Sequence, residues 1–232
     1  MSDYPASEAA RRSLDLERIS SVHMTPEELL TTTRSVRRRL DLTRNVPRDL
    51  LVECVETASQ APTGSNRQQW HWLIVTDPDK RSFIGECYRK SWYAYAVGSR
   101  PTFEPEDPRA ERQERVQTSA RFLADHMGEV PALVIACIEG RAEGRDNLAM
   151  AGLYGSILPA AWSFMLAARL RGLGSAYTTL HLAYEREVAE RLGLPFERIT
   201  QAALLPVAYF TGEDFLRAAR IPLEDILHWD EW

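Results

Sequence analysis

Residues 145–171 constrain the fold more than any other part of the sequence, because the segment is long and apolar on nearly all sides. Small and apolar residues dominate it, among them Ala160, Trp162 and Phe164. Its length and composition are those of a helix, and a helix without a polar face is normally buried all round. The sequence therefore predicts one long helix, placed either at the centre of the molecule or in an interface between subunits.

The composition is that of an ordinary globular protein. The chain has 232 residues, of which 44% are hydrophobic and 26% charged, so global disorder and collagen-like repeats are excluded. The net charge of −5 argues against an extended nucleic-acid surface. The longest uninterrupted apolar run, near residues 130–138, has about half the length of a bilayer span. We therefore expect neither a nucleic-acid partner nor a membrane partner.

The cysteines and the first residues suggest the compartment. Cys54, Cys87 and Cys137 are odd in number and widely spaced, which is typical of free thiols in a reducing environment. Residues 1–20 carry charges and no apolar stretch, unlike a secretory signal. We expect a cytoplasmic protein in which residues 1–24 form a flexible arm and residues 25–232 a single domain.

Periodicity and turn residues divide the domain into helices and strands. Thr25, Pro26 and Glu28 have the pattern of a helix capping box. Further helices are expected from about 47 to 60, from 78 to 97, up to 127 and over 185–192, and strands over 70–76, 132–138, 174–179 and 202–210. The irregular order of helices and strands predicts an α+β fold. Pro206 predicts that the last strand lies at a sheet edge or carries a bulge.

Residues 98–116 are predicted to form a lid or a disordered excursion, because several prolines lie there among Arg, Glu and Asp. The segment before it, residues 88–95, is rich in aromatic residues that could enclose a planar substrate. Trp92 and Tyr93, with Ser65 from an earlier turn, are the candidate substrate contacts. Packing on the core explains the two aromatic residues equally well.

Several common catalytic motifs are missing. There is no phosphate-binding GxxxxGK[ST] loop and no GxSxG nucleophile elbow. The sequence Gly172-Leu173-Gly174 follows a helix and precedes a strand, so it indicates a helix C-cap rather than a dinucleotide fingerprint. The histidines show no metal-ligand spacing, and no metal site is predicted.

Basic and hydroxyl-bearing residues remain as binding candidates. Arg34 and Arg37 flank Ser35, and two guanidinium groups with a hydroxyl suit a phosphate, although a solvated basic run has the same pattern. Thr178 and Thr179 place hydroxyls at the end of a predicted strand, although threonines at such a position most often reflect β-propensity alone.

A glycine-containing turn is a further candidate. In Pro62-Thr63-Gly64-Ser65-Asn66, the missing Cβ of Gly64 lets backbone N–H groups approach a planar ligand. An ordinary turn has the same composition. Each of these signals is therefore weak when it stands alone.

Five sequence blocks, taken together, are more specific. In chain order they are Arg34-Ser35-Val36-Arg37 with Val46-Pro47, residues 61–70, residues 166–174, residues 203–209, and residues 220–230 with their tryptophan-bearing tail. Over roughly residues 25–232 these blocks resemble the nitroreductase family of FMN-dependent oxidoreductases. Two departures are Gln69, where that family usually has proline, and Ala218, where a second basic residue often precedes Arg220.

The resemblance implies a fold and a cofactor site. The fold would be a mostly antiparallel sheet flanked by helices, in a homodimer whose core contains the long helix and whose C-terminal tail wraps the partner. The FMN phosphate and ribityl chain would contact Arg34, Ser35, Arg37 and Arg220. The partner subunit would supply Pro62, Thr63, Gly64 and Asn66. The isoalloxazine ring would lie against Thr178, Thr179 and Leu180, with Thr179 near its N5 atom.

The resemblance also implies the chemistry. NADH or NADPH would reduce the flavin and leave, and an electron-poor nitroaromatic, quinone or enone would then accept the hydride in a ping-pong cycle. The runner-up is a reductive dehalogenase similar to halotyrosine deiodinases, which grip an amino acid with a Glu, a Tyr and a Lys from the lid. In this chain the Glu and Tyr positions fall on Trp92 and Ala96. A protein that binds or sequesters FMN without turnover is a third possibility.

Overall fold

The computed structural model describes residues 24–98, 103–104, 107, 109–212 and 215–232. The arm expected at residues 1–24 therefore lies outside the described residues, apart from Met24. The described elements, in chain order, are α2 (Pro26–Thr32), α3 (Arg48–Ala58), η2 (Gly64–Asn66), β1 (Trp70–Val75), α4 (Pro78–Gly98), α5 (Ala110–His126), η3 (Met127–Glu129), β2 (Ala132–Glu139), α6 (Asn147–Leu170), β3 (Leu173–Ser175), η4 (Leu180–Tyr184), α7 (Glu185–Leu192), β4 (Ile199–Tyr209) and η5 (Leu223–Asp225).

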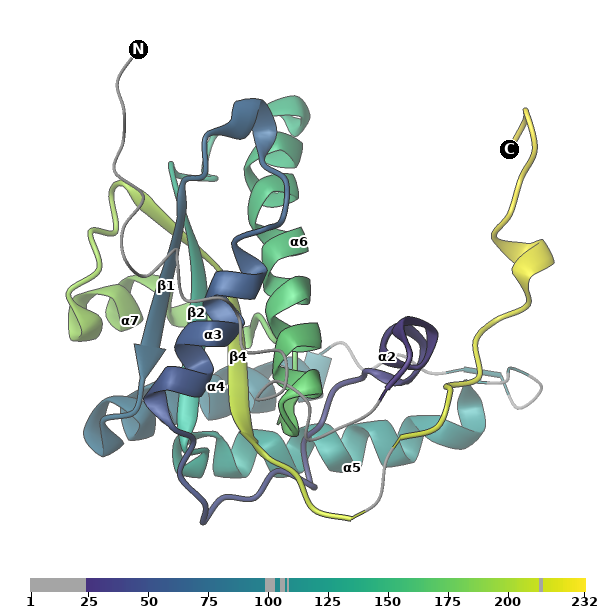
Figure 1. Cartoon of the computed structure of the whole chain (residues 1–232), viewed down its shortest axis with the longest axis horizontal. Coiled ribbons are helices and arrows are strands. Elements are labelled where there is room, and N and C mark those ends of the chain that lie inside the picture. The colour runs from purple at the N-terminus through teal and green to yellow at the C-terminus, as the bar shows by residue number, and fades with distance from the viewer. Residues whose placement is uncertain (1–23, 99–102, 105–106, 108, 213–214) are drawn as a thin grey trace.

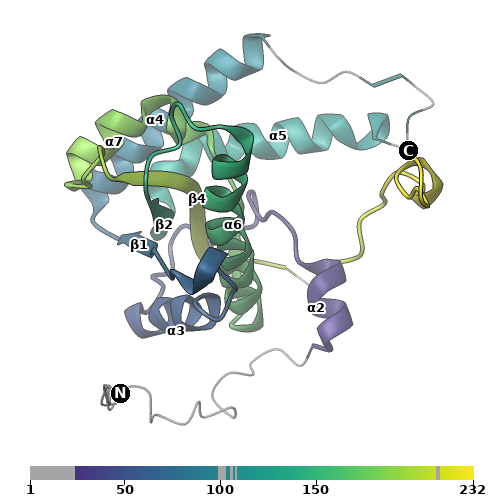
Figure 2. The ribbon, with the colours of Figure 1, turned by 90° about the horizontal axis from the view of Figure 1, so that it is seen from above.

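A four-stranded antiparallel sheet in the order β1-β2-β4-β3 lies between two layers of helices (Figure 1). In the view from above, α4, α5 and α7 lie on one side of the sheet and α3 on the other (Figure 2). The two central strands are buried along almost their whole length, as strands covered on both faces must be. The α+β fold with helices flanking an antiparallel sheet is thus confirmed.

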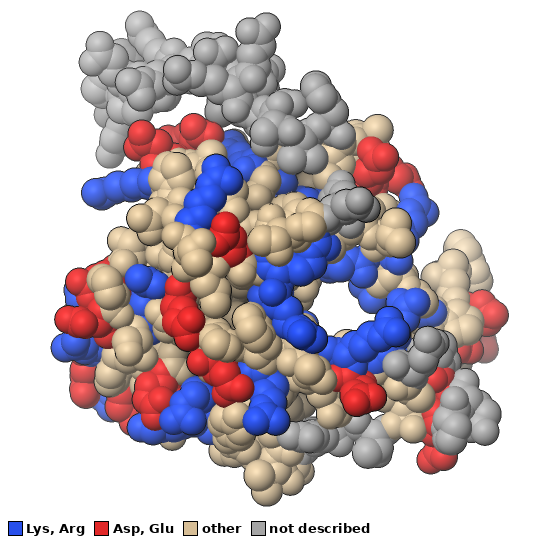
Figure 3. Space-filling model, turned by 90° about the horizontal axis from the view of Figure 1, so that it is seen from below, with Lys and Arg blue, Asp and Glu red and all other residues tan. Residues whose placement is uncertain are grey.

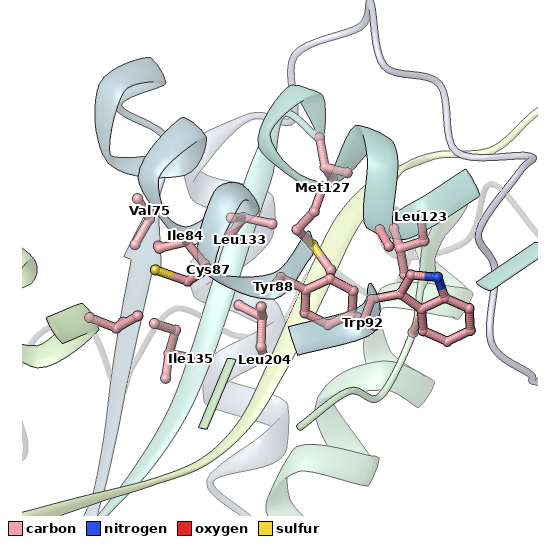
Figure 4. Close-up of a cluster of buried hydrophobic side chains, with 14 of the residues drawn as sticks. Val75, Ile84, Cys87, Tyr88, Trp92, Leu123, Met127, Leu133, Ile135 and Leu204 are labelled. Atoms are coloured by element: carbon pink, nitrogen blue, oxygen red, sulfur yellow. The ribbon is translucent and has the colours of Figure 1, made fainter. Parts of the chain in front are cut away.

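Alternate residues of β2 enter two separate hydrophobic cores. Leu133 and Ile135 join the core formed with α4 and α5, which Figure 4 shows around Tyr88 and Met127. Val134 and Ala136 join the other core, formed with α3 and α6. This division follows from the alternation of side chains along a strand.

Helix α6 confirms the predicted long helix, but in the single chain it is not buried on all sides. Ile157, Phe164 and Met165 are buried against the sheet, whereas Leu158 and Trp162 are 37% and 40% exposed on the opposite face. By length and hydropathy this helix could cross a membrane, and 39% of its most apolar window is buried inside the structure. Core helices of soluble proteins have the same length and composition, so this is weak evidence for a membrane span.

Two predicted element boundaries were wrong. Residues 110–116, expected in the lid segment, form the first two turns of α5, which leaves a shorter connection after α4. The strand expected over residues 174–179 ends at Ser175, and Thr178 makes only an isolated bridge with Leu204. Both boundaries depend on contacts with segments that are distant in the sequence, and the local sequence does not encode those contacts.

The interruption after Ser175 explains how β4 accepts Pro206. The predicted edge position was wrong, because β4 lies between β2 and β3. The alternative, a bulge, is present in β4 but away from the proline, at Ala202, where the register with β2 shifts between Ala136 and Cys137. Leu204 exchanges hydrogen bonds with Thr178 at 3.1 and 2.8 Å, so the nitrogen of Pro206, two residues on, faces the same side of the strand. At that position the β3 pairing has ended at Ser175, and no ladder hydrogen bond is lost to the proline.

Candidate functional site

The segment Arg34–Arg37 is fixed at the edge of β3. The capping box of α2 is present, with the Thr25 Oγ1 accepting from the Glu28 N–H at 3.2 Å. After α2 the chain runs extended, and the Val36 N–H donates to the Ser175 carbonyl at 2.8 Å. A Cβ added at Gly174 would lie 3.0 Å from the Val36 Cβ, so a larger residue would have to push the two segments slightly apart.

Arg34 belongs to a group of three arginines that come from distant parts of the chain. Its guanidinium donates to the carbonyls of Thr32 and Leu216. Partial burial lowers the Arg34 pKa, and the positive charges of Arg220 and Arg112 lower it further. Figure 3 shows an opening bordered by Lys and Arg side chains on the face seen from below. Arg112 of α5 was not among the predicted site residues, because its segment was expected to be a loop.

Arg37 is linked to Thr178 through a buried tyrosine. Burial lowers the pKa of Arg37, and the nearby Tyr88 phenol opposes that shift. Burial raises the pKa of Tyr88, against the effects of Arg37 and of a hydrogen bond with Thr178. The Thr178 Oγ1 donates to the Leu204 carbonyl at 2.7 Å. Tyr88, which the sequence placed in the aromatic segment 88–95 but not among the cofactor contacts, thus joins two predicted site residues from the side of α4.

Thr179 and Leu180 follow directly at the start of η4. Thr179 is exposed and occupies the N-cap position, and Leu180 is half-buried. The predicted FMN contacts within one chain therefore come from two neighbouring segments and from the part of the C-terminal segment that Arg34 reaches. They are Arg34, Ser35, Arg37, Thr178, Thr179, Leu180 and Arg220.

The turn Pro62–Asn66 lies elsewhere in the chain, against the N-terminal half of α6. Its Gly64 N–H donates to the Ser156 Oγ at 3.2 Å, and Ser65 and Asn66 have positive φ angles of 53° and 52°. From Ser156 to the end of α6, which leads into β3, the helix axis rises by roughly 22 Å at 1.5 Å per residue. A single chain therefore does not bring this turn, with Pro62, Thr63, Gly64 and Asn66, to the arginine group.

The candidate substrate residues lie in three different environments. Trp92 is 9% exposed and belongs to the core shown in Figure 4. The Tyr93 hydroxyl donates to the Asp125 Oδ1 at 2.8 Å and so joins α4 to α5. Ser65 is exposed and lies in the wall of a cavity of about 860 Å³.

In the described part of the chain, neither a reactive thiol nor a metal-binding cluster adds a catalytic group to this site. Cys54, Cys87 and Cys137 are free and buried, and burial raises the pKa of Cys54 and of Cys137 to about 12. These thiols are poor nucleophiles at neutral pH. Among the described residues no three His, Cys, Asp or Glu side chains are grouped to hold a metal ion.

One family model matches the sequence, and several solved structures share its fold. A family model described as "Nitroreductase family" matches residues 30–209. An iodotyrosine deiodinase solved with FMN and 3-iodo-L-tyrosine is 22% identical, with a TM-score of 0.67 over 89% of this chain and 99% of that one.

Two other solved structures are similar to the same extent. The FMN and NADPH-dependent nitroreductase NfnB from Sphigopyxis sp. strain HMH is 23% identical, with a TM-score of 0.60 over 90% of this chain and all of that one. A BluB-like flavoprotein from Clostridium difficile 630 is 17% identical, with a TM-score of 0.64 over 90% and 100%. At these identities the structures show a common fold. No functionally curated protein matches the sequence.

Proposed function

The chain belongs to the nitroreductase family, and we propose that it is a homodimeric, FMN-dependent oxidoreductase that reduces electron-poor organic compounds with NADH or NADPH. The observation that carries the proposal is the group of Arg34, Arg112 and Arg220. Partial burial and then the positive charges of Arg220 and Arg112 lower the Arg34 pKa, and no described carboxylate forms an ion pair with any of the three arginines. A phosphate would relieve this repulsion, so the residues fit FMN.

In the proposed complex each group has a separate role. Arg34, Arg112 and Arg220 neutralise the phosphate, while Arg37 and Ser35 add hydrogen-bond donors for the phosphate and the ribityl chain. Thr178, Thr179 and Leu180 line the ring, and the hydrogen bond of Thr178 to the Leu204 carbonyl fixes that segment to the sheet. When bound, FMN supplies the hydride transfer from the nicotinamide donor to a nitroaromatic, quinone or enone acceptor. The protein itself then orients the reactants and stabilises charge.

A second subunit would complete the site. We propose that Pro62, Thr63, Gly64 and Asn66 contact the flavin bound mainly by the partner chain, since in one chain they lie far from the arginine group. The exposed apolar face of α6 and the exposed side chains of Leu216, Trp229 and Trp232 would be covered in such a dimer. In Figure 1 the C-terminal segment runs away from the sheet and its helices. Exposed apolar surface of this kind is typical of an interface.

The decisive experiment is to record the visible spectrum of the purified protein and then add NADH and NADPH separately without oxygen. A flavin band that bleaches with either donor supports the proposal, and acceptor compounds can then be screened. A band that persists with both donors would instead favour a protein that binds FMN without turnover. No band, even after FMN is added, would contradict the cofactor assignment.

Reductive dehalogenation is the second candidate, because one of the similar structures is an iodotyrosine deiodinase. Trp92 and Ala96 are each 9% exposed and belong to the hydrophobic core. Neither side chain can offer a carboxylate or hydroxyl to an amino-acid zwitterion. Any halogenated substrate would therefore be an aromatic compound that is held without those contacts.

We also propose that the protein is soluble and works in the cytoplasm. Family membership and the packing of α6 against the sheet favour a soluble protein. The free thiols of Cys54, Cys87 and Cys137 are compatible with a reducing compartment.

A further inference from the structure

The cavity beside the turn Pro62–Asn66 has features that the proposed flavin site does not use. Its volume is about 860 Å³, and it lies between residues 63–69, the ends of β1 and β2, the N-terminal half of α6 and residues 194–199. Ligand-binding cavities commonly have volumes of roughly 300–1,000 Å³. The space is therefore large enough for a substantial part of a nucleotide.

The charged side chains in the cavity wall are mostly basic. Arg67, Arg145 and Arg198 line it together with His71 and one carboxylate, Glu139. Glu139 is already engaged: its Oε2 accepts from Gln69 at 2.8 Å, and its Oε1 lies 3.2 Å from the His71 Nε2. These hydrogen bonds, followed by the charges of His71 and Arg198, lower the Glu139 pKa. The wall thus has an excess of positive charge at neutral pH.

Arginine is the common basic residue of this chain, so a cluster of arginines alone is not informative. Elsewhere Arg141 and Arg171 form ion pairs with glutamates. No carboxylate among the described residues forms an ion pair with Arg67, Arg145 or Arg198. An anionic ligand would provide the missing partner, and guanidinium groups match phosphate oxygens in a bidentate way.

We propose that this cavity binds the phosphate-bearing end of the nicotinamide donor and that its arginines select NADPH over NADH. The inference rests on the proposed function, because Thr63 and Gly64 belong both to the cavity wall and to the turn assigned to the partner's flavin. A donor whose nicotinamide lies on that flavin can extend its other end into the cavity. NADPH differs from NADH by one 2′-phosphate, which carries a charge of about −1.5 to −2 at pH 7. Several arginines without acidic partners suit that additional charge.

The test measures donor selectivity in the FMN-loaded protein. Arg145→Gln and Arg198→Gln each remove one cavity charge, and Arg89→Gln is the matched control, because Arg89 is an exposed arginine of α4 paired with Glu86 outside the cavity. The rate of flavin reduction is followed without oxygen at several concentrations of NADPH and NADH. Competition by 2′,5′-ADP and by 5′-AMP separates recognition of the 2′-phosphate from recognition of the shared 5′-phosphate.

We expect the parent protein to prefer NADPH and each cavity variant to lose roughly tenfold in the NADPH to NADH ratio of the second-order rate constant for flavin reduction, with 2′,5′-ADP competing less well. Arg89→Gln should keep the parent ratio. Flavin reduction with the same donor ratio in all variants, or a parent preference for NADH, overturns the inference and leaves the proposed function intact. Flavin that neither donor reduces overturns both. Flavin content and circular dichroism of each variant identify any loss of folding.

Discussion

Individual positive charges decide whether the arginine group binds an anion, and Arg220 tests this directly. It is exposed and reaches Arg34 from the C-terminal segment. Arg220→Ala should raise the Kd for FMN at least about tenfold, because a charge-assisted phosphate contact contributes roughly 1.5–3 kcal/mol. The measurement is flavin retained after gel filtration, together with fluorescence titration of FMN. The melting temperature of the flavin-free protein should not change.

Arg217→Ala is the matched control for this substitution. Arg217 lies in the same segment and is 65% exposed, but it forms an ion pair with Glu27, and surface pairs of this kind contribute little. Its loss should leave FMN binding within about twofold of the parent. Stoichiometric flavin retention in Arg220→Ala would contradict the phosphate assignment.

Gly85 of α4 allows close packing against the backbone of η3, because it has a hydrogen atom where other residues have a Cβ. A Cβ on this residue of α4 would lie 2.5 Å from the backbone nitrogen of Gly128, and backbone cannot move aside as a side chain does. Gly85→Ala should therefore destabilise the protein by about 1–3 kcal/mol, despite the better helix propensity of alanine. Gly98→Ala, at the end of the same helix, where no atom of the described residues lies within 4 Å of the added Cβ, should not destabilise it. Urea unfolding compares the two, and equal stability of both variants would exclude the close contact.

His181 predicts a pH dependence of stability. It is fully buried, neither ring nitrogen has a hydrogen-bond partner among the described residues, and burial lowers its pKa from 6.5 to about 3. Between pH 3 and 6.5 the His181 imidazole is protonated in the unfolded chain but not in the folded one. His181 therefore does not reduce the free energy of unfolding above pH 6.5, and it lowers that free energy progressively as the pH falls from 6.5 to 3. Between pH 7 and 5 the loss should be about 2 kcal/mol. Denaturant unfolding of His181→Gln at both pH values should show a smaller difference. An unchanged difference would show that other groups cause it.

At the scale of elements, the sequence predicted best what short segments determine alone. The capping box of Thr25 and Glu28 and the helix Glu185–Leu192 were confirmed at their predicted positions, because caps and amphipathic repeats lie within one helix. The end of β3 at Ser175 and the central place of β4 were missed. Both depend on residues far away in the chain, as does the recruitment of Arg112 and Tyr88 to the site.

Helix α7 is attached to the sheet by one partly buried ion pair, which gives a prediction at this scale. Arg141 donates to both oxygens of Glu185 at 2.9 and 2.8 Å, and the Gln201 N–H donates to the same carboxylate at 2.9 Å. Glu185→Gln leaves Arg141 without its main counter-charge and should cost about 1–3 kcal/mol in unfolding free energy. Glu197→Gln removes an exposed pair with Arg186 and should cost less than about 0.5 kcal/mol. If both variants lose the same unfolding free energy in thermal unfolding, the partly buried pair stabilises the protein no more than the exposed pair does.

At the scale of the whole molecule, one chain holds two separate halves of the predicted binding surface. The resemblance predicted this division by assigning the turn Pro62–Asn66 to a partner subunit, and the structure describes one chain only. No local sequence pattern could have predicted this division, because neither segment contains information on whether the two lie close together in the folded chain. In the homodimer that we propose, this division would make the affinity for FMN depend on association of two chains.

That dependence can be tested without touching a proposed FMN contact. Trp162 is 40% exposed on the apolar face of α6, which we propose to be the subunit interface. Trp162→Glu should convert the dimer to a monomer and, since the partner's turn is then missing, raise the Kd for FMN at least about tenfold. Val52→Glu, at a similarly exposed position of α3 (43%), is the control. Light scattering after gel filtration gives the oligomeric state, and the flavin absorbance of each peak gives occupancy. A monomeric variant that keeps one FMN per chain would show that a single chain completes the site.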